Sequence, residues 1–383
     1  MGTFNFASTE LPEEAMALRQ EIRQFLREEQ DKGTFVPACD SWLGGFSPEF
    51  SQKLGDRGYI GMTLPKKFGG HERLGLERYV VIEELLAVGA PVAAHWIADR
   101  QMAPLILRHG NEEQQQRFIP DIAKGRSYWA IGMSEPNAGS DLAAVQCKLD
   151  PDGDGYRLSG AKIWTSGAHK CHYMMTLVRS GPVGKNRHEG LSNVAVNLKD
   201  EAVEVRPIKL MNGEHHFNEV NFNDVFIPKE DVIGEVGDGW RQVTEELAYE
   251  RSGPERFLST FPLLKILVDR TRKTNPQVFV SEIAPLISEL TALREMSLSI
   301  ARILGEGGNP VVEAALVKDA GTYFERKVTE IGQRLFDLVP EHGSLNTYSH
   351  LLAEALIHGP GFTIRGGTNE ILRGIVVRGL GLR

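Results

Sequence analysis

The stretch YRLSGAKIWTSG, residues 156–167, differs in pattern from both ends of this chain. Its short runs of apolar, β-branched and aromatic residues are typical of strands and not of long helices. Similar runs recur between about Tyr128 and Ile233, for example at Met174–Val178 and Val203–Ile208. Just before residue 156, Asp152-Gly153-Asp154-Gly155 suits a tight hairpin turn. The middle third of the chain therefore predicts a β domain.

Helical periodicity flanks this β segment on both sides. Between about Pro12 and Lys124, apolar residues recur at helical spacing, as at Tyr79, Ile82, Leu85 and Leu86, with Glu83 and Glu84 on the other face. Asn111-Glu112 suits the cap of a glutamine-rich helix that ends at Pro120. After Gly239 long helical patterns return. This order predicts a mixed α and β fold: an N-terminal helical domain (1–125), a central β domain (126–235) and a C-terminal helical bundle (236–383). It argues against a doubly wound parallel sheet.

The composition excludes several functional classes. The 383 residues include 41% hydrophobic and 25% charged residues, as in ordinary globular proteins, and carry a net charge of −8, which argues against nucleic-acid binding. The cysteines, Cys39, Cys147 and Cys171, lie far apart and show no metal-ligand spacing, so neither a disulfide framework nor a metal site is expected. No apolar run is long enough for a membrane span, and the N-terminus is acidic. We therefore expect a mature cytoplasmic protein.

The segment IGMSEPNAGSD, residues 131–141, ends an expected strand in a turn with two glycines and several hydroxyl or amide groups. Backbone N–H groups that such a turn leaves free can face an anion, and a glycine allows close approach. A pyrophosphate suits this arrangement. The same residues also fit a surface turn that its own Ser and Asn side chains stabilise, and local pattern leaves both interpretations open.

A second segment favours a flat aromatic ligand. In the expected strand, Trp164 and Ser166 are two residues apart and so should point to the same side, where one offers a stacking surface and the other a hydrogen bond. This combination suits a flavin ring. Alternatively, Trp164 fills the core of the β domain.

Together the two segments resemble the acyl-CoA dehydrogenase family, and the resemblance covers nearly the whole chain. The matching stretches occur in family order: Gly110–Pro120, Ser134-Glu135-Pro136, Lys162–Ser166, Gly213–Pro228, Gly239-Trp240 and Gly367-Thr368-Asn369-Glu370. The resemblance implies an α-helical N-terminal domain, a central β domain and a C-terminal four-helix bundle. It also implies FAD held between the β and C-terminal domains and a neighbouring subunit.

The resemblance assigns roles to the turn after the first strand. Ile131, Met133 and Ser134 correspond to residues that line the isoalloxazine and hydrogen-bond its pyrimidine edge. Gly139 and Ser140 correspond to residues that meet the pyrophosphate or the pantetheine of the substrate. This turn is therefore expected to bind both FAD and the acyl-CoA.

Two further segments carry expected FAD contacts. In the family the residue at Trp164 packs on the flavin, and Ser166 replaces a common threonine that hydrogen-bonds flavin N5. Thr368, Asn369 and Glu370 match a C-terminal loop that contacts the FAD phosphates and adenosine. A serine retains the hydroxyl donor, so the exchange preserves the expected contact.

The reaction needs a carboxylate beside the α carbon of the substrate. Many family members carry it just before a Gly-Thr pair, but here that position is Gly366. Other members carry it in a Glu-Arg pair on the helix after the β domain, which here is Glu250-Arg251. Glu250 also falls on the apolar stripe of Val243 and Leu247, where burial would raise its pKa. We predict Glu250 as the base and Arg251 as a partner of substrate or base, against the alternative of a surface salt bridge.

Departures from the family pattern bear on assembly and substrate. Arg272-Lys273-Thr274 lacks the Phe-Gly-Lys that normally follows, and residues 334–340 replace a glutamine-rich glycine loop. These features resemble bacterial members that act on steroid side chains and pair with a different subunit. The resemblance implies a homotetramer or an α2β2 hetero-oligomer, a bulky or branched acyl group above Gly366-Gly367, and an electron-transfer flavoprotein as acceptor.

Two other functions remain open from the sequence. A flavin-dependent oxygenase or nitroalkane oxidase of the same fold typically uses an aspartate or histidine, which the Glu250-Arg251 pair disfavours. A non-catalytic partner subunit, which completes the flavin site of another chain, would account for the altered loops. Bleaching of the bound flavin by acyl-CoA separates the dehydrogenase from the oxygenase, and a colourless isolated protein would indicate the partner subunit.

Overall fold

The computed structural model describes residues 4–335 and 339–382, without the side chains of residues 246–250. The chain divides into two compact units, each held together by contacts among its own residues. Unit 1 consists of Met1–Phe46, Arg73–Val92 and Leu247–Arg383, and unit 2 of Ser47–Glu72 and Ala93–Glu246. The N-terminal helical region thus contributes to both units, and the division into three consecutive domains stays a prediction.

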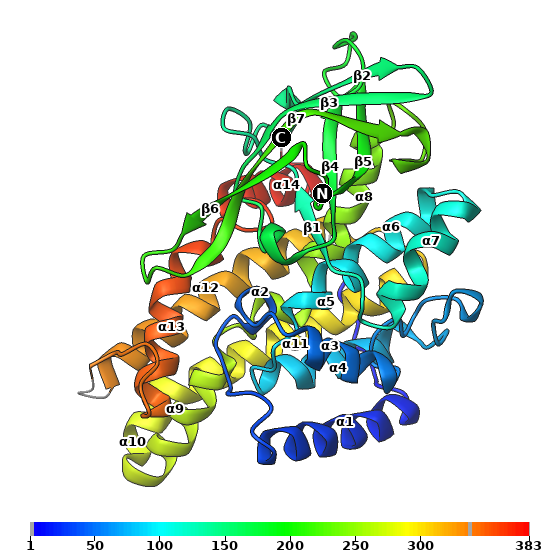
Figure 1. Ribbon diagram of the computed structural model, residues 1–383. Helices are drawn as coiled ribbons and strands as arrows, with labels where there is room; N and C mark the ends of the chain where they lie inside the picture. Colours follow the sequence, from blue (N-terminus) through cyan, green and yellow to red (C-terminus); the bar gives the residue numbers. More distant parts are fainter. Residues whose placement is uncertain (1–3, 336–338, 383) are drawn as a thin grey trace. The chain divides into compact units, whose positions relative to one another are not determined.

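Unit 2 contains an eight-stranded sheet (Figure 1). Its strands are β1 (Trp129–Gly132), β2 (Lys148–Asp152), β3 (Gly155–Lys162), β4 (Tyr173–Arg179), β5 (Leu191–Asn197), β6 (Val203–Lys209), β7 (His215–Pro228) and β8 (Val232–Ile233). The order is β6-β7-β3-β2-β4-β5-β8, with β1 beside β4. Only β1 and β2 run parallel to β4, and the other pairs are antiparallel. The predicted β domain and its hairpin at Gly153-Asp154 are therefore confirmed.

Short helices complete unit 2: α3 (Pro48–Asp56), α5 (Ala93–Ile97), α6 (Ala103–His109) and α7 (Glu112–Ala123). Asn111 caps α7 by accepting the Gln114 N–H at 2.9 Å, as expected from the sequence. The expected end of α7 at Pro120 is wrong. Proline lacks only its own N–H, and in the last turn the helix continues to Ala123, with the Pro120 carbonyl accepting the Lys124 N–H.

Helix α8 (Gly239–Ser252) begins in unit 2 and ends in unit 1. The other helices of unit 1 are α1 (Glu13–Asp31), α2 (Ser41–Gly44), α4 (Gly75–Ala87), α9 (Phe261–Thr274), α10 (Pro276–Val278), α11 (Ala284–Gly305), α12 (Val311–Leu335), α13 (Thr347–Phe362) and α14 (Asn369–Gly379). Helix α4 is buried almost all round, so Glu83 and Glu84 do not form a solvated face. Instead Glu83 pairs with Arg19 and Arg294, and Glu84 with Arg23.

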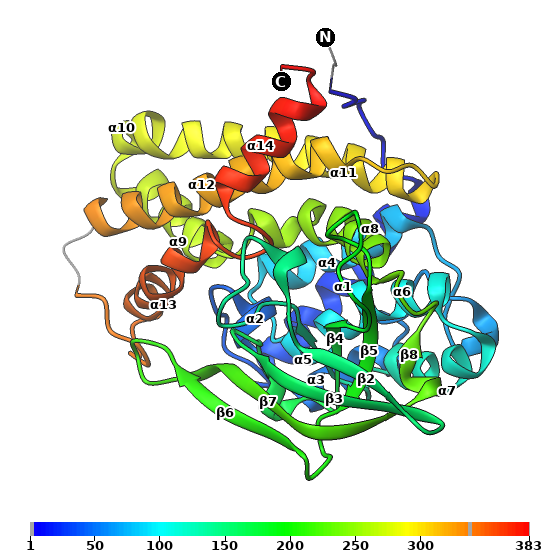
Figure 2. The ribbon, with the colours of Figure 1, turned by 90° about the horizontal axis from the view of Figure 1, so that it is seen from above.

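Four helices of unit 1, α9, α11, α12 and α13, pack as a bundle, with α14 against α12. Figure 2 shows α11 and α12 running side by side. Gly332 on α12 lies where an added Cβ would touch Leu263 of α9 and Leu352 of α13 at 3.4 Å. A small residue here allows the three helices to approach closely. The expected C-terminal bundle is confirmed.

Candidate active site

The end of β1 is fastened to the end of β3 by a buried lysine. The Lys162 side chain is fully buried and donates from Nζ to the Glu135 carboxylate at 2.8 Å and to the Met133 carbonyl at 3.1 Å. Next to it, the Ile163 N–H donates to the Ser134 carbonyl at 2.9 Å. Burial lowers the pKa of Lys162, while the adjacent carboxylate favours the charged form. These contacts bring the 133–135 turn directly beside Trp164.

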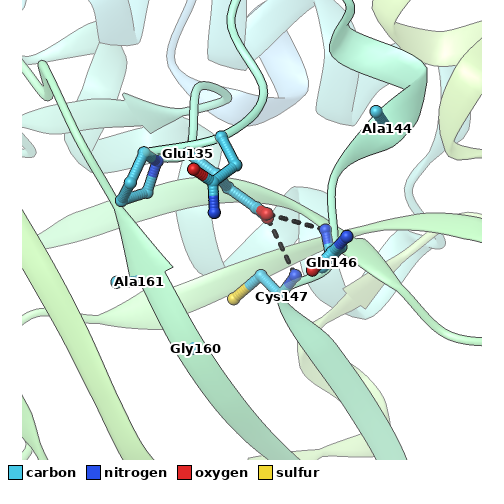
Figure 3. A pocket seen from close by; sticks show the side chains of 8 residues that line it. Glu135, Ala144, Gln146, Cys147, Gly160 and Ala161 are labelled. Atoms are coloured by element: carbon cyan, nitrogen blue, oxygen red, sulfur yellow. Dashed lines mark hydrogen bonds between the residues drawn. The ribbon is translucent and has the colours of Figure 1, made fainter.

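Glu135 organises the turn through hydrogen bonds to protein donors. Its two carboxylate oxygens accept the backbone N–H groups of Gln146 and Cys147 at 2.7 and 2.8 Å, as Figure 3 shows. A surface hollow of about 270 Å³ lies beside these residues. Its lining consists of Glu135, Pro136, Asn137, Ala144, Gln146, Cys147, Gly160 and Ala161. The flavin contacts expected from the sequence do not line this hollow, so we assign it no role in the reaction.

Trp164 does not continue the strand. Pairing of β3 with β7 ends at Lys162–Val220, and Trp164 has φ = 60°, the left-handed conformation that a bulky residue rarely adopts. Such a conformation costs about 1–3 kcal/mol and is frequent at functional sites. The inference that strand periodicity turns Trp164 and Ser166 to one side is therefore wrong. The alternative of a core tryptophan is wrong as well, because Trp164 is 57% exposed.

The other β-domain residues expected from the sequence to form the site differ in how exposed they are. Ile131, Met133, Ser134 and Ser166 are half-buried, whereas Gly139 and Ser140 are exposed beyond the turn. A Cβ added to Gly139 would meet no atom within 4 Å, so the backbone is accessible there. Among the described residues, the buried Thr165 hydroxyl has no hydrogen-bond partner. An exposed indole with hydroxyl and backbone donors beside it fits a flavin ring.

In unit 1, the loop that replaces the usual catalytic position is held by two buried cations. Gly366 and Gly367 both have positive φ, at 68° and 93°. Arg251 Nε donates to the Gly366 carbonyl at 3.0 Å, and Lys318 Nζ donates to the Gly367 carbonyl at 2.8 Å. Arg251 is 5% exposed and Lys318 is fully buried. Arg251 is thus not a solvated surface arginine, and its role in binding substrate stays a prediction.

The three C-terminal residues expected to contact FAD differ in how accessible they are. The Asn369 side chain is buried and accepts from Lys318 at 2.9 Å, which occupies its oxygen. The Thr368 hydroxyl caps α14 by accepting the Ile371 N–H. Glu370 is exposed in the first turn of α14, where its own backbone N–H and the Thr368 hydroxyl lower its pKa. A contact between Asn369 and a cofactor would therefore have to use its backbone.

A buried charge cluster precedes the loop and was not expected from the sequence. Arg365 donates to Asp40, to Ser259 Oγ at 2.8 Å and to the Glu325 carboxylate at 3.2 Å. Burial raises the pKa of Glu325 to about 7. Burial also opposes ionisation of Asp40, but Arg365 and His358 outweigh it and lower the pKa of Asp40 to about 2. The partners lie between 40 and 325 residues from Arg365 in sequence, so no local pattern could reveal them.

The predicted base falls on helix α8. The Glu250 side chain lies outside the described residues, as does that of Leu247. On the same helix, Val243 is buried, as the stripe argument requires, and Glu245 pairs with His109 at 3.1 Å and Arg108 at 3.2 Å. The assignment of Glu250 as base stays a prediction.

Within residues 4–335 and 339–382, one group of three side chains has potential metal-ligand atoms within 4.8 Å of one another: His342, His350 and Glu354. The Gly343 N–H donates to His350 Nδ1 at 3.1 Å, so a neutral His350 ring carries its proton on Nε2, which faces Glu354 at 3.4 Å. A metal would need the lone pair of that nitrogen. The arrangement therefore does not favour a metal ion.

Comparisons with known proteins agree with this architecture. The acyl-CoA dehydrogenase N-terminal domain matches residues 12–126, and the acyl-CoA dehydrogenase middle domain matches residues 130–225. Acyl-CoA dehydrogenase IpdE1 of Mycolicibacterium smegmatis is 30% identical over 96% of this chain and 98% of that protein. This chain therefore belongs to the acyl-CoA dehydrogenase family, and it is an oxidoreductase.

Solved structures resemble the chain over almost its whole length. The Tcur3481-Tcur3483 steroid ACAD has a TM-score of 0.83 and 26% identity, over 98% of this chain and 99% of that chain. The ChsE4-ChsE5 complex from Mycobacterium tuberculosis has a TM-score of 0.80 and 25% identity, over 98% of both chains. Among the described residues, no helix has the length and apolar character needed to span a membrane.

Proposed function

We propose that this protein uses FAD to dehydrogenate an acyl-CoA thioester between its α and β carbons, giving a trans-2-enoyl-CoA. The observation that carries the proposal is the exposed Trp164, fixed beside the 133–134 turn in a chain of this family. Bound FAD would accept the hydride, which carries both electrons, that leaves the β carbon. Family membership supports the reaction, and the exposed indole supports the cofactor.

We propose Glu250 as the group that takes the α proton. Gly366 has no side chain at the position where many relatives carry the base, so another carboxylate is required. The Glu250-Arg251 pair matches the second family position, and the neighbouring Arg251 is buried against the Gly366 carbonyl. The proton would pass from the substrate α carbon to the Glu250 carboxylate as the C–H bond breaks.

Two features support a bulky or branched acyl group. The absence of side chains at Gly366 and Gly367 leaves room that a glutamate would otherwise fill. One similar solved structure is named a steroid ACAD. We propose a role in lipid breakdown of the steroid-degradation or fatty acid β-oxidation type.

The proposed assembly is a homotetramer or an α2β2 hetero-oligomer with a related subunit. Similarity to the ChsE4-ChsE5 complex supports the second arrangement. An electron-transfer flavoprotein is the proposed acceptor of the electrons. Three free, buried cysteines are consistent with the proposed cytoplasmic location, since oxidising compartments favour paired ones.

The test begins with the colour of the protein expressed alone. A yellow product that bleaches when acyl-CoA is added anaerobically supports the proposal, and the panel should run from straight-chain to branched and ring-bearing thioesters. Glu250→Gln should slow bleaching by about 10²–10⁴-fold, whereas Glu245→Gln on the same helix should not. A yellow protein that no acyl-CoA bleaches would contradict the dehydrogenase. A colourless product would favour a non-catalytic partner subunit.

A further inference from the structure

Thr165, the residue after Trp164, is held on both sides by one asparagine of β7. Its N–H donates to the Asn218 carbonyl at 3.0 Å, and its carbonyl accepts the Asn218 side-chain amide at 2.9 Å. Asn218 is fully buried. The backbone that follows Trp164 is therefore fixed in position by the main chain and the side chain of the same residue.

The orientation of the Asn218 amide is itself determined. Because its nitrogen donates to Thr165, its oxygen is the acceptor for His215 Nε2, which lies 2.6 Å away. The His215 ring stacks on His169 with centroids 3.6 Å apart and an interplanar angle of 16°. His169 follows the Trp164 bend in sequence, so the bend contacts the start of β7 at two points.

Trp164 requires such support because its conformation is strained. A bulky residue stays in the left-handed region only where its surroundings leave it no alternative. On the preceding side, the Ile163 N–H donates to the Ser134 carbonyl, and the Trp164 ring meets Phe217 edge-on with centroids 5.9 Å apart. Asn218 and Ser134 thus fix the backbone on the two sides of Trp164, while the indole itself remains 57% exposed.

We propose that Asn218, oriented by His215, is a positioning residue that holds the indole of Trp164 ready for the isoalloxazine ring. This inference rests on the proposed flavin site and adds residues to it that do not themselves touch the cofactor. An indole already fixed before binding loses little conformational freedom when the flavin arrives. Removal of the Asn218 amide should therefore loosen Trp164 in the FAD-free protein and weaken FAD binding.

The test compares Asn218→Ala with Asn221→Ala, a control on the same strand whose amide contacts only Glu219 among the hydrogen bonds known for it. The first measurement uses no cofactor: the time-resolved fluorescence anisotropy of Trp164, obtained by subtracting the signal of Trp164→Phe. The subtraction also removes the signal of the other four tryptophans, of which Trp42, Trp96 and Trp129 are buried and Trp240 is half-buried. Asn218→Ala should add a nanosecond motion that neither wild type nor Asn221→Ala shows.

The second measurement is FAD affinity by titration, which should fall at least tenfold in Asn218→Ala and stay within twofold in Asn221→Ala. If Asn218→Ala does not fold, His215→Phe keeps a ring against His169 but removes the contact to Asn218, and smaller changes in the same direction are expected. Unchanged Trp164 anisotropy in the folded variant would overturn the inference. A wild-type protein that binds no FAD would instead overturn the proposed function, and the anisotropy would still decide the role of Asn218.

Discussion

Replacing Glu325 with glutamine should change how the stability of unit 1 depends on pH. The Glu325 carboxyl is fully buried, accepts the Ser259 N–H at 2.8 Å and pairs with Arg365 at 3.2 Å. Burial outweighs these favourable contacts and raises the pKa of Glu325 to about 7 from an ordinary value of 4.5. The folded protein therefore holds a proton here that the unfolded chain releases at lower pH.

The sign and size of the effect follow from this difference. Between pH 4.5 and about 7 the folded state binds the proton and the unfolded state does not. The contribution of the carboxyl to stability is therefore complete below pH 4.5 and is lost as the pH rises through 7. At about 1.4 kcal/mol for each pH unit, the loss amounts to about 3 kcal/mol. A glutamine does not titrate, so the variant lacks this dependence.

Urea unfolding between pH 5 and pH 8.5, followed by tryptophan fluorescence, measures the effect. Other titrating groups are common to both proteins, so the difference in unfolding free energy isolates position 325. That difference should change by about 3 kcal/mol in favour of Glu325→Gln as the pH rises. Glu330→Gln, on the same helix but with a 64% exposed side chain, is the matched control. A difference that is constant to about 0.5 kcal/mol would refute the reasoning.

Three further outcomes are expected. Lys162→Met should lower the unfolding free energy of unit 2 by about 3–5 kcal/mol, because it leaves the Glu135 carboxylate buried without its cation. The control Lys148→Met removes a surface ion pair and should lower the unfolding free energy by less than about 1 kcal/mol. Equal urea midpoints for Lys162→Met and Lys148→Met would contradict the prediction. Arg251→Ala should lower kcat about tenfold with little change in KM, as steady-state kinetics would measure, because a loop carbonyl loses its donor. Burial lowers the pKa of His169 to about 4. Because the unfolded chain then binds a proton that the folded protein does not, the unfolding free energy should fall as the pH drops from 6.5 towards 4. The melting temperature of His169→Gln should fall less over the same pH range.

The helices and strands of the fold could be predicted from local sequence patterns. Alternation and β-branched residues identified the strands, and the Asn111 cap and the Gly153-Asp154 turn were correct because such signals involve residues a few positions apart. The end of α7 was misjudged because proline in a last turn removes only one hydrogen bond. Local signals also could not show that Glu83 and Glu84 meet arginines from other helices.

The candidate site was only partly predictable. The family motif singled out Trp164 as a stacking surface, and its exposure agrees, but the strand periodicity used to orient it does not apply to a left-handed residue. Nothing local to residues 215–218 indicated a contact with Thr165, since the two segments are about 50 residues apart. The pairing of Lys162 with Glu135 was missed for the same reason.

The sequence by itself determined the family, the order of helical and β segments and the absence of a carboxylate at Gly366, because these depend on residue types and their local spacing. Only the tertiary structure decided which buried charges have partners and how the strained bend at Trp164 is held. The physical reason is that burial and hydrogen bonding depend on which distant segments meet in space. The contacts of Asn218, Lys162 and Arg365 exist only once the sheet and the bundle are assembled.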